Sequence, residues 1–158
     1  MPRIEPVFLY ALFQERGWGS WAHMPTRDEH VAEIERRAAA YGLPPVTWPE
    51  TWPPNSVNAS RSILWAERHG RAADQARALM RGSFAEGRDS SGLDVIREVA
   101  AGLGLPADEF DPAAFKDELR ARTAQAWADG VMGVPTLRVG DELFYGDDRL
   151  EAAAAAAA

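Results

Sequence analysis

The stretch GVPTLRVGDELFYGDDRL, residues 133–150, carries the clearest structural signal in the chain. Residues 136–139 and 142–145 alternate in the way that two half-buried strands do. Between them, Gly140 and Asp141 suit a two-residue turn with glycine at its first central position. We therefore predict a β-hairpin, followed by a turn at residues 146–148 and an alanine-rich final helix.

The sequence upstream of this hairpin favours helices, because apolar residues recur there at helical spacing. The predicted helices cover residues 26–41, 57–69, 72–86, 91–103 and 111–130. Thr26 with Glu29 is typical of a capping box, and Ser91 and Asp111 are expected N-caps. Residues 44–55 are dense in proline and tryptophan, so we expect an irregular loop there.

An apolar run near the N-terminus, from Pro6 to Phe13, permits two interpretations. It forms either a buried strand followed by one helical turn or a short helix, and periodicity alone does not decide between them. The same region shows no signal peptide. Nowhere does an apolar run approach the roughly 20 residues of a membrane span. We therefore expect a cytoplasmic protein with no membrane partner.

The composition excludes several classes of function. The net charge is −7 and no basic run is present, which argues against a nucleic-acid-binding surface. The chain contains no cysteine, which excludes disulfide exchange, thiolate nucleophiles and thiolate metal sites. Any thiol chemistry must therefore use a thiol brought by a ligand. His23, His30 and His69 lack the spacing of metal ligands, so no metal site is expected.

Two motifs near the C-terminal end are similar to those of a known family. Gly133-Val134-Pro135-Thr136 stands directly before the first predicted strand, and Phe144 to Leu150 precedes the last helix. At this spacing they resemble the C-terminal half of the DsbA-like thioredoxin family. More narrowly, they resemble 2-hydroxychromene-2-carboxylate isomerases and kappa-class glutathione transferases. Further similarities to this group lie at residues 6–9, 41–44, 52–55 and 86–89.

The resemblance implies a fold class and a domain organisation. We expect an α-rich α/β fold, thioredoxin-like (DsbA-like), in a single domain over residues 1–158. Residues 26–130, approximately, would form a helical insertion, and residues 1–20 and 131–158 would be what remains of the thioredoxin core. Residues 6–9 correspond to the family's second strand, so its first strand and helix are missing. The expected explanations are a start site placed too late in a longer reading frame, or a fragment whose sheet edges another chain completes.

The same resemblance implies a glutathione site. The Val134-Pro135 peptide is cis in the family, and the main-chain groups of Val134 would pair with the cysteine backbone of glutathione. Asp147 and Asp148 correspond to a pair that holds the α-amino group of the γ-glutamyl moiety. Arg27 corresponds to a basic residue that reaches the glycine carboxylate. Simpler roles stay open for each, namely a trans proline in a loop, helix caps and a surface arginine.

The tryptophans and the missing segment bear on the substrate and the chemistry. Trp48 and Trp52 either wall a hydrophobic substrate site or pack a rigid loop. Trp18 stands where kappa-class relatives have an asparagine that contacts the ligand, so the chain departs from the family there. The serine that favours the glutathione thiolate in relatives falls in the missing segment. No catalytic residue is therefore identified in this chain.

The function implied by the resemblance is that of a glutathione-dependent isomerase or transferase. Its partners would be glutathione, as the cofactor, and a small aromatic or otherwise hydrophobic electrophile, and a homodimer is possible as in relatives. The thiol would add to the electrophile and be expelled again by an isomerase, whereas the adduct would persist in a transferase. The alternative is a non-catalytic binding module of DsbA-like shape. The family also contains disulfide oxidoreductases, but the absence of cysteine excludes that chemistry here.

Overall fold

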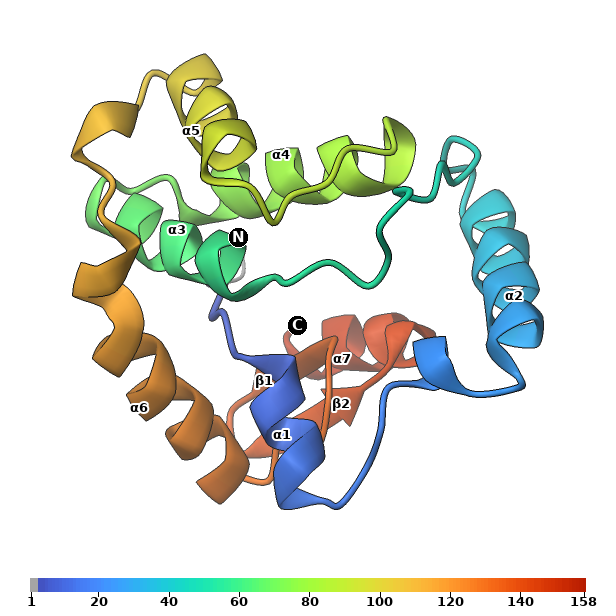
Figure 1. The fold of residues 1–158 in the computed structure, drawn as a ribbon. Coiled ribbons are helices and arrows are strands. Elements are labelled where there is room, and N and C mark those ends of the chain that lie inside the picture. Colours follow the sequence, from blue (N-terminus) through green and yellow to red (C-terminus); the bar gives the residue numbers. More distant parts are fainter. Residues whose placement is uncertain (1–2) are drawn as a thin grey trace.

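The computed structural model describes residues 3–158 and is rich in helices. Figure 1 shows helices at the top and at both sides, with a small β-hairpin and two short helices at the bottom. The elements are, in order, α1 (Leu9–Glu15), α2 (Arg27–Ala40), α3 (Val57–Arg68), α4 (Ala72–Ala85), α5 (Leu93–Gly102), α6 (Lys116–Ala128), β1 (Thr136–Val139), β2 (Glu142–Tyr145) and α7 (Leu150–Ala156). Four short 3-10 turns join them, at residues 21–23, 107–109, 112–115 and 147–149.

The hydrophobic core lies among α3, α4, α5 and α6, which we call the helical body. Its buried residues are Ala59, Leu64, Trp65, Ala66, Leu79, Ile96, Ala100, Leu105, Phe110, Phe115 and Leu119. Three aromatic rings meet in it, with the Phe110 ring 5.4 Å from that of Trp65 and 6.4 Å from that of Phe115. The helices predicted over residues 57–69, 72–86 and 91–103 are confirmed here as α3 to α5, and their apolar stripes face the core. The helix predicted over residues 111–130 is observed as a 3-10 turn at residues 112–115 followed by α6, which contributes Leu119 to the core.

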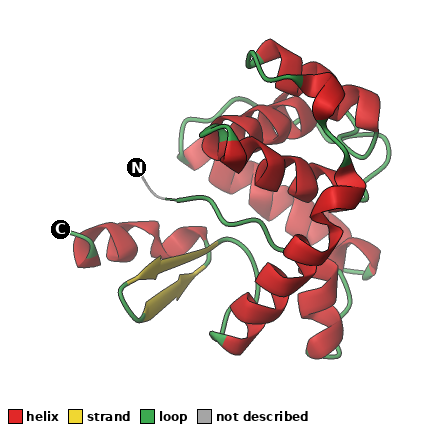
Figure 2. Ribbon diagram, turned by 90° about the vertical axis from the view of Figure 1, so that its left-hand side faces the viewer, coloured by secondary structure: helices red, strands yellow, loops and turns green. Residues whose placement is uncertain are grey.

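The hairpin is also confirmed, with β1 and β2 antiparallel in the register Thr136↔Tyr145 to Val139↔Glu142. Gly140 has a φ of 58° and Asp141 a negative φ, as in a turn with glycine at its first central position. Helix α7 packs on one face of the hairpin, where Phe144 and Ala153 are buried. Figure 2 shows the hairpin and α7 standing to one side of the helices. We call these two elements the hairpin lobe.

Of the two interpretations of the apolar run near the N-terminus, the short helix is confirmed and the strand over residues 6–9 is wrong. Residues 3–8 have no regular secondary structure, and the apolar run continues as helix α1. The hydrogen bonds of Phe8 explain the difference. Its N–H donates to Thr123 Oγ1 at 2.9 Å, and its carbonyl accepts from Ala11 at 3.0 Å, which begins the helix. A strand at this position would need a neighbouring strand for these groups.

Two predicted helix caps also differ from the structure. Thr26 is the N-cap of α2, but its side chain makes no capping hydrogen bond, and its carbonyl instead contacts His30 Nδ1 at 2.8 Å. Helix α5 begins at Leu93 after Gly92, so Ser91 is not its N-cap. The cap at Asp111 is confirmed, because its side chain accepts from the Ala113 N–H at 2.9 Å. That cap opens the 3-10 turn that leads into α6.

Candidate functional site

The candidate site begins at the outer edge of β1. Hydrogen-bonded and non-hydrogen-bonded pairs alternate along an antiparallel ladder. The Gly146 N–H donates to the Pro135 carbonyl at 3.0 Å, which makes 135 and 146 a hydrogen-bonded pair in the same register. The main-chain groups of Val134, Thr136 and Arg138 therefore point away from β2. Within residues 3–158, no main-chain hydrogen bond reaches them from another segment.

Two glycines at this end of the hairpin allow close contacts that a Cβ would prevent. A Cβ on Gly133 would lie 2.9 Å from the ring of Tyr145. Gly146 has a φ of 102°, and a Cβ there would lie 2.5 Å from Oδ1 of Asp148. The Asp148 carboxylate thus lies over the backbone of Gly146, whose N–H bonds Pro135. Val134, Pro135 and Asp148 are therefore gathered at one end of the hairpin, and the Val134-Pro135 peptide is cis.

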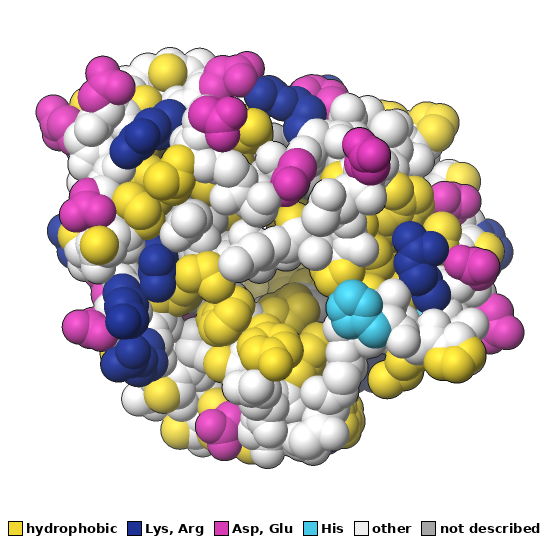
Figure 3. Space-filling view, in the orientation of Figure 1, with side chains coloured by type: hydrophobic (Ala, Val, Ile, Leu, Met, Phe, Trp, Pro, Cys, Tyr) yellow, Lys and Arg dark blue, Asp and Glu magenta, His cyan; other side chains and the backbone are white. Residues whose placement is uncertain are grey.

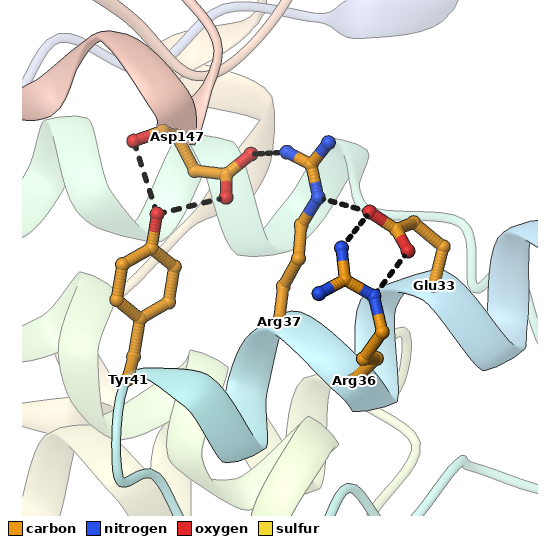
Figure 4. Close-up of polar contacts among 5 residues, drawn as sticks. All are labelled: Glu33, Arg36, Arg37, Tyr41 and Asp147. Carbon is orange, nitrogen blue, oxygen red and sulfur yellow. Dashed lines mark hydrogen bonds and ion pairs between the residues drawn. The ribbon is translucent and has the colours of Figure 1, made fainter.

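Asp147 has a different role from Asp148, because side chains of α2 hold it. Its Oδ1 accepts from Arg37 Nη1 at 2.7 Å and its Oδ2 from the Tyr41 hydroxyl at 3.2 Å. Figure 4 shows this cluster, in which Arg37 and Arg36 also bind Glu33. The two arginines lower the pKa of Glu33 to about 2, Arg36 more than Arg37. Asp147 therefore ties α2 to the hairpin lobe, and its carboxylate is already neutralised by Arg37.

The helix-cap alternative for the two aspartates is not observed. They lie in the 3-10 turn at residues 147–149, and α7 begins at Leu150 with Arg149 as its N-cap. Neither carboxylate makes a capping hydrogen bond there. Asp148 is exposed, and the hydrogen bonds and ion pairs among the described residues do not include its carboxylate.

Arg27 does not join this group. It lies in the first turn of α2, where its Nη1 is 3.4 Å from Oδ1 of Asp28, and both side chains are largely exposed. No contact among residues 3–158 links it to Val134 or Asp148. In this structure Arg27 is therefore a surface arginine, the simpler of its two expected roles. Trp18 is likewise half exposed, and its ring is covered by the Arg16 guanidinium at 3.6 Å.

Trp48 and Trp52 belong to an aromatic cluster on the loop between α2 and α3. Their ring centroids are 4.8 Å apart, and the ring of Trp21 lies 4.8 Å from Trp52 on the other side. Phe84 of α4 and His30 of α2 extend the cluster, with His30 stacked on Trp21 at 5.0 Å. Trp21 was not singled out from the sequence, because a tryptophan in an irregular segment gives no periodic signal. In the orientation of Figure 1, Figure 3 shows apolar side chains in a hollow near the middle of the molecule, with a histidine beside it.

Other kinds of site are not indicated by the described residues. No group of three or more His, Asp or Glu side chains within residues 3–158 is arranged to hold a metal ion. His69 packs edge-on against Trp65, at 5.0 Å between ring centres. As for membranes, the helices of residues 3–158 are too short or too polar for any of them to cross one.

Comparison with known proteins places this arrangement in a family. Over 130 residues the chain is 34% identical to the 2-hydroxychromene-2-carboxylate isomerase of Sphingobium xenophagum, with 77% of this chain aligned. The chain spans 63% of the length of that relative. Residues 8–158 match the DSBA-like thioredoxin domain family.

Two solved structures have similar folds. A 2-hydroxychromene-2-carboxylate isomerase aligns with a TM-score of 0.81 at 22% identity, over 98% of this chain and 78% of that one. A probable DsbA oxidoreductase from Streptomyces coelicolor aligns with a TM-score of 0.69 at 25% identity, over 94% of this chain and 66% of that one. The predicted fold class is thus confirmed. The chain belongs to the DSBA-like thioredoxin domain family, and within it resembles the 2-hydroxychromene-2-carboxylate isomerases.

Proposed function

We propose that this chain binds glutathione at the Val134 end of the hairpin and takes part in an isomerase-type reaction on a small aromatic electrophile. One observation carries the proposal. The hydrogen bond from Gly146 to Pro135 brings Val134, whose main-chain groups point away from β2, to the same end of the hairpin as the exposed carboxylate of Asp148. A free main-chain edge next to a carboxylate suits a peptide that carries an ammonium group.

The residues fit glutathione in part. The N–H and C=O of Val134 can pair with the cysteinyl backbone, and Asp148 can accept from the α-ammonium group of the γ-glutamyl moiety. Asp147 is already held by Arg37, so we assign this contact to Asp148 alone. Glutathione, when bound, would supply the thiol that the cysteine-free chain lacks. The similarity to a named isomerase supports that class of reaction over thiol-disulfide exchange.

The aromatic cluster supports a flat, apolar substrate. Trp21, Trp48 and Trp52 are each only partly buried, and their rings adjoin one another. Aromatic faces of this kind bind flat rings by stacking and by excluding water. We assign the electrophile to this cluster, with Trp52 at its centre because its ring contacts both of the others.

Calorimetry with reduced glutathione tests the binding step. We expect saturable heat for the unchanged protein and an affinity about tenfold lower for Asp148→Ala, because a charge-assisted hydrogen bond is lost. Asp141→Ala is the matched control, since it removes an aspartate from the turn at the other end of the hairpin and should leave the affinity unchanged. Absence of heat at millimolar glutathione would reject the proposal.

A non-catalytic binding module remains the second candidate, and one observation favours it. The arginine expected at the glycine carboxylate, Arg27, lies apart from Val134 and Asp148 and pairs with Asp28 instead. Following the absorbance of 2-hydroxychromene-2-carboxylate with and without glutathione separates the two candidates. Glutathione-dependent isomerisation that Asp148→Ala slows supports the enzyme, whereas binding without turnover identifies the module.

A further inference from the structure

Side chains of α2 and its C-cap residue hold Asp147 but not Asp148, although the two aspartates are adjacent in the turn after β2. Arg37 Nη1 donates to Asp147 Oδ1 at 2.7 Å. The Tyr41 hydroxyl lies 3.2 Å from Asp147 Oδ2 and 3.4 Å from the main-chain carbonyl oxygen of the same residue (Figure 4). Within residues 3–158, every hydrogen bond between α2 or its C-cap and this turn therefore falls on Asp147.

The contact with the Asp147 carbonyl also bears on Asp148, because this carbonyl belongs to the planar peptide group that joins the two residues. Holding the oxygen of that group orients the N–Cα bond of Asp148. The Asp148 carboxylate lies near enough for its charge to help raise the pKa of the Tyr41 hydroxyl, after the larger effects of desolvation and of Asp147. On its other side, this carboxylate meets the backbone of Gly146. The position of Asp148 is thus defined by its neighbours in the chain.

Helix α2 has no buried side chain, so apolar packing does not fix its position. Polar contacts at its surface do this instead. Glu35 Oε1 accepts from the indole N–H of Trp48 at 2.9 Å, and Arg37 and Tyr41 reach the turn after β2. Exposed contacts of this kind add little to global stability. We therefore expect the loss of Arg37 or Tyr41 to change the placement of the turn more than the fold.

We propose that Arg37 and Tyr41 are positioning residues of the glutathione site, which hold Asp147 so that the carboxylate of Asp148 faces the ammonium group of the γ-glutamyl moiety. This inference rests on the proposed function and deepens it. Neither side chain touches the ligand, because both act through Asp147. The ion pair with Arg37 also occupies the Asp147 carboxylate, which leaves that of Asp148 for the single ammonium group.

Calorimetry on the whole chain with two ligands tests the proposal. The first is reduced glutathione, and the second is glutaryl-cysteinyl-glycine, in which a hydrogen replaces the ammonium group. The unchanged protein should bind glutathione about tenfold more tightly than the second ligand, as expected for one charge-assisted hydrogen bond. Arg37→Ala and Tyr41→Phe should each reduce this preference to about threefold or less. Their affinity for glutaryl-cysteinyl-glycine should stay the same, whereas a general loss of structure would weaken both ligands alike.

Arg36→Ala is the matched control, because Arg36 binds Glu33 as Arg37 does. No hydrogen bond or ion pair among the described residues joins Arg36 to Asp147, so this variant should keep the full preference for glutathione. Arg37→Lys retains a cation that can reach Asp147 and should restore part of the preference that Arg37→Ala loses. Tyr41→Phe removes one hydroxyl from an exposed ring, which keeps the test valid where Arg37→Ala does not fold.

The possible results separate this inference from the proposed function. An unchanged preference in Arg37→Ala or Tyr41→Phe would overturn the positioning role while leaving the glutathione site in place. Equal weakening of both ligands would also overturn it, since the residues would then act on the fold alone. If the unchanged protein binds neither ligand, the proposed function fails and this inference with it. Equal affinity of the unchanged protein for the two ligands would reject Asp148 as the partner of the ammonium group, and with it any role for residues that position Asp148.

Discussion

The helical body and the hairpin lobe differ in how completely they are closed. In the helical body, α3 to α6 surround a continuous set of buried side chains, several of them fully inaccessible, such as Ile96 and Ala100. The hairpin lobe has two strands, one covering helix and few buried apolar residues, chiefly Phe144 and Ala153. Its free edge and its exposed Val134 and Tyr145 face outward.

Because of this difference, we expect the helical body to determine stability and the hairpin lobe to determine binding. Buried apolar area is the main stabilising contribution in folding, and most of it lies in the helical body. Unpaired main-chain groups and exposed apolar side chains are what a ligand or peptide can use, and they lie in the hairpin lobe. We therefore expect substitutions in the body to change the free energy of unfolding, and substitutions in the lobe mainly to change binding.

The largest expected effect is on the free energy of unfolding, in a comparison of Phe110→Ala with Phe144→Ala. Phe110→Ala removes the ring at the centre of the aromatic group and should lower the free energy of unfolding by about 3–5 kcal/mol. Phe144→Ala should cost less, because its ring is packed by one helix and one strand pair only. Urea denaturation followed by circular dichroism measures both. A larger loss for Phe144→Ala would contradict the division between body and lobe.

The next largest effect is expected for Gly146→Ala at the end of the hairpin, on both stability and glutathione affinity. Alanine at a φ of 102° is strained and should cost about 1–3 kcal/mol. The new Cβ would also displace the Asp148 carboxylate, so glutathione affinity should fall as well. Gly104→Ala in the body is the control, since its φ of 74° is also positive but open space surrounds it. It should lower stability without changing glutathione binding, as thermal denaturation and calorimetry can show.

The third expected effect concerns Thr123, which connects the helical body to the N-terminal segment at residues 3–8. Its hydroxyl accepts from the Phe8 N–H and donates to the Leu119 carbonyl at 2.8 Å. Thr123→Val keeps the shape but leaves the Phe8 N–H unpaired, at a cost of about 1–2 kcal/mol. Hydrogen exchange at the Phe8 amide should accelerate, because its hydrogen bond to Thr123 is lost. Thr123→Ser restores the hydroxyl, and a failure of this rescue would argue against the hydrogen bond as the cause.

Local sequence patterns predicted the helices and the hairpin better than the segment at residues 6–9. Helical periodicity located α3 to α5, because apolar residues that face the core every three or four positions leave a repeated signal. The segment that contains α6 was identified instead by its N-cap at Asp111. Gly140 and Asp141 likewise identified the hairpin through local turn chemistry. The strand expected at residues 6–9 failed because a strand depends on a partner that local sequence does not specify. Phe8 found Thr123 instead, 115 residues away.

The site residues show the same limit. Val134-Pro135 and the aspartates after β2 lie at one end of the hairpin, because a two-residue turn fixes the register that joins the two strands. The distinct role of Asp147 was not foreseen, since it depends on Arg37 and Tyr41 of a helix more than 100 residues earlier. Arg27 was placed by family resemblance alone, and the structure gives it a surface position.

The smallest effect concerns pH and the helix that links the two regions. Hydrogen bonds from Arg36 and then Arg37 depress the pKa of Glu33 from 4.5 to about 2. A carboxyl whose pKa is lower in the folded state stabilises it at pH values above the unfolded pKa, and this contribution disappears as pH falls toward the folded pKa. The contribution of Glu33 to the stability of α2 should therefore be lost as pH falls from about 4.5 to about 2, while the apolar core around Phe110 carries no such dependence. Carbon-detected NMR titration of the Glu33 carboxyl measures the shift directly. Arg36→Ala should raise the pKa back toward 4.5, and an unchanged value in that variant would show that the contact with Arg36 is not the cause.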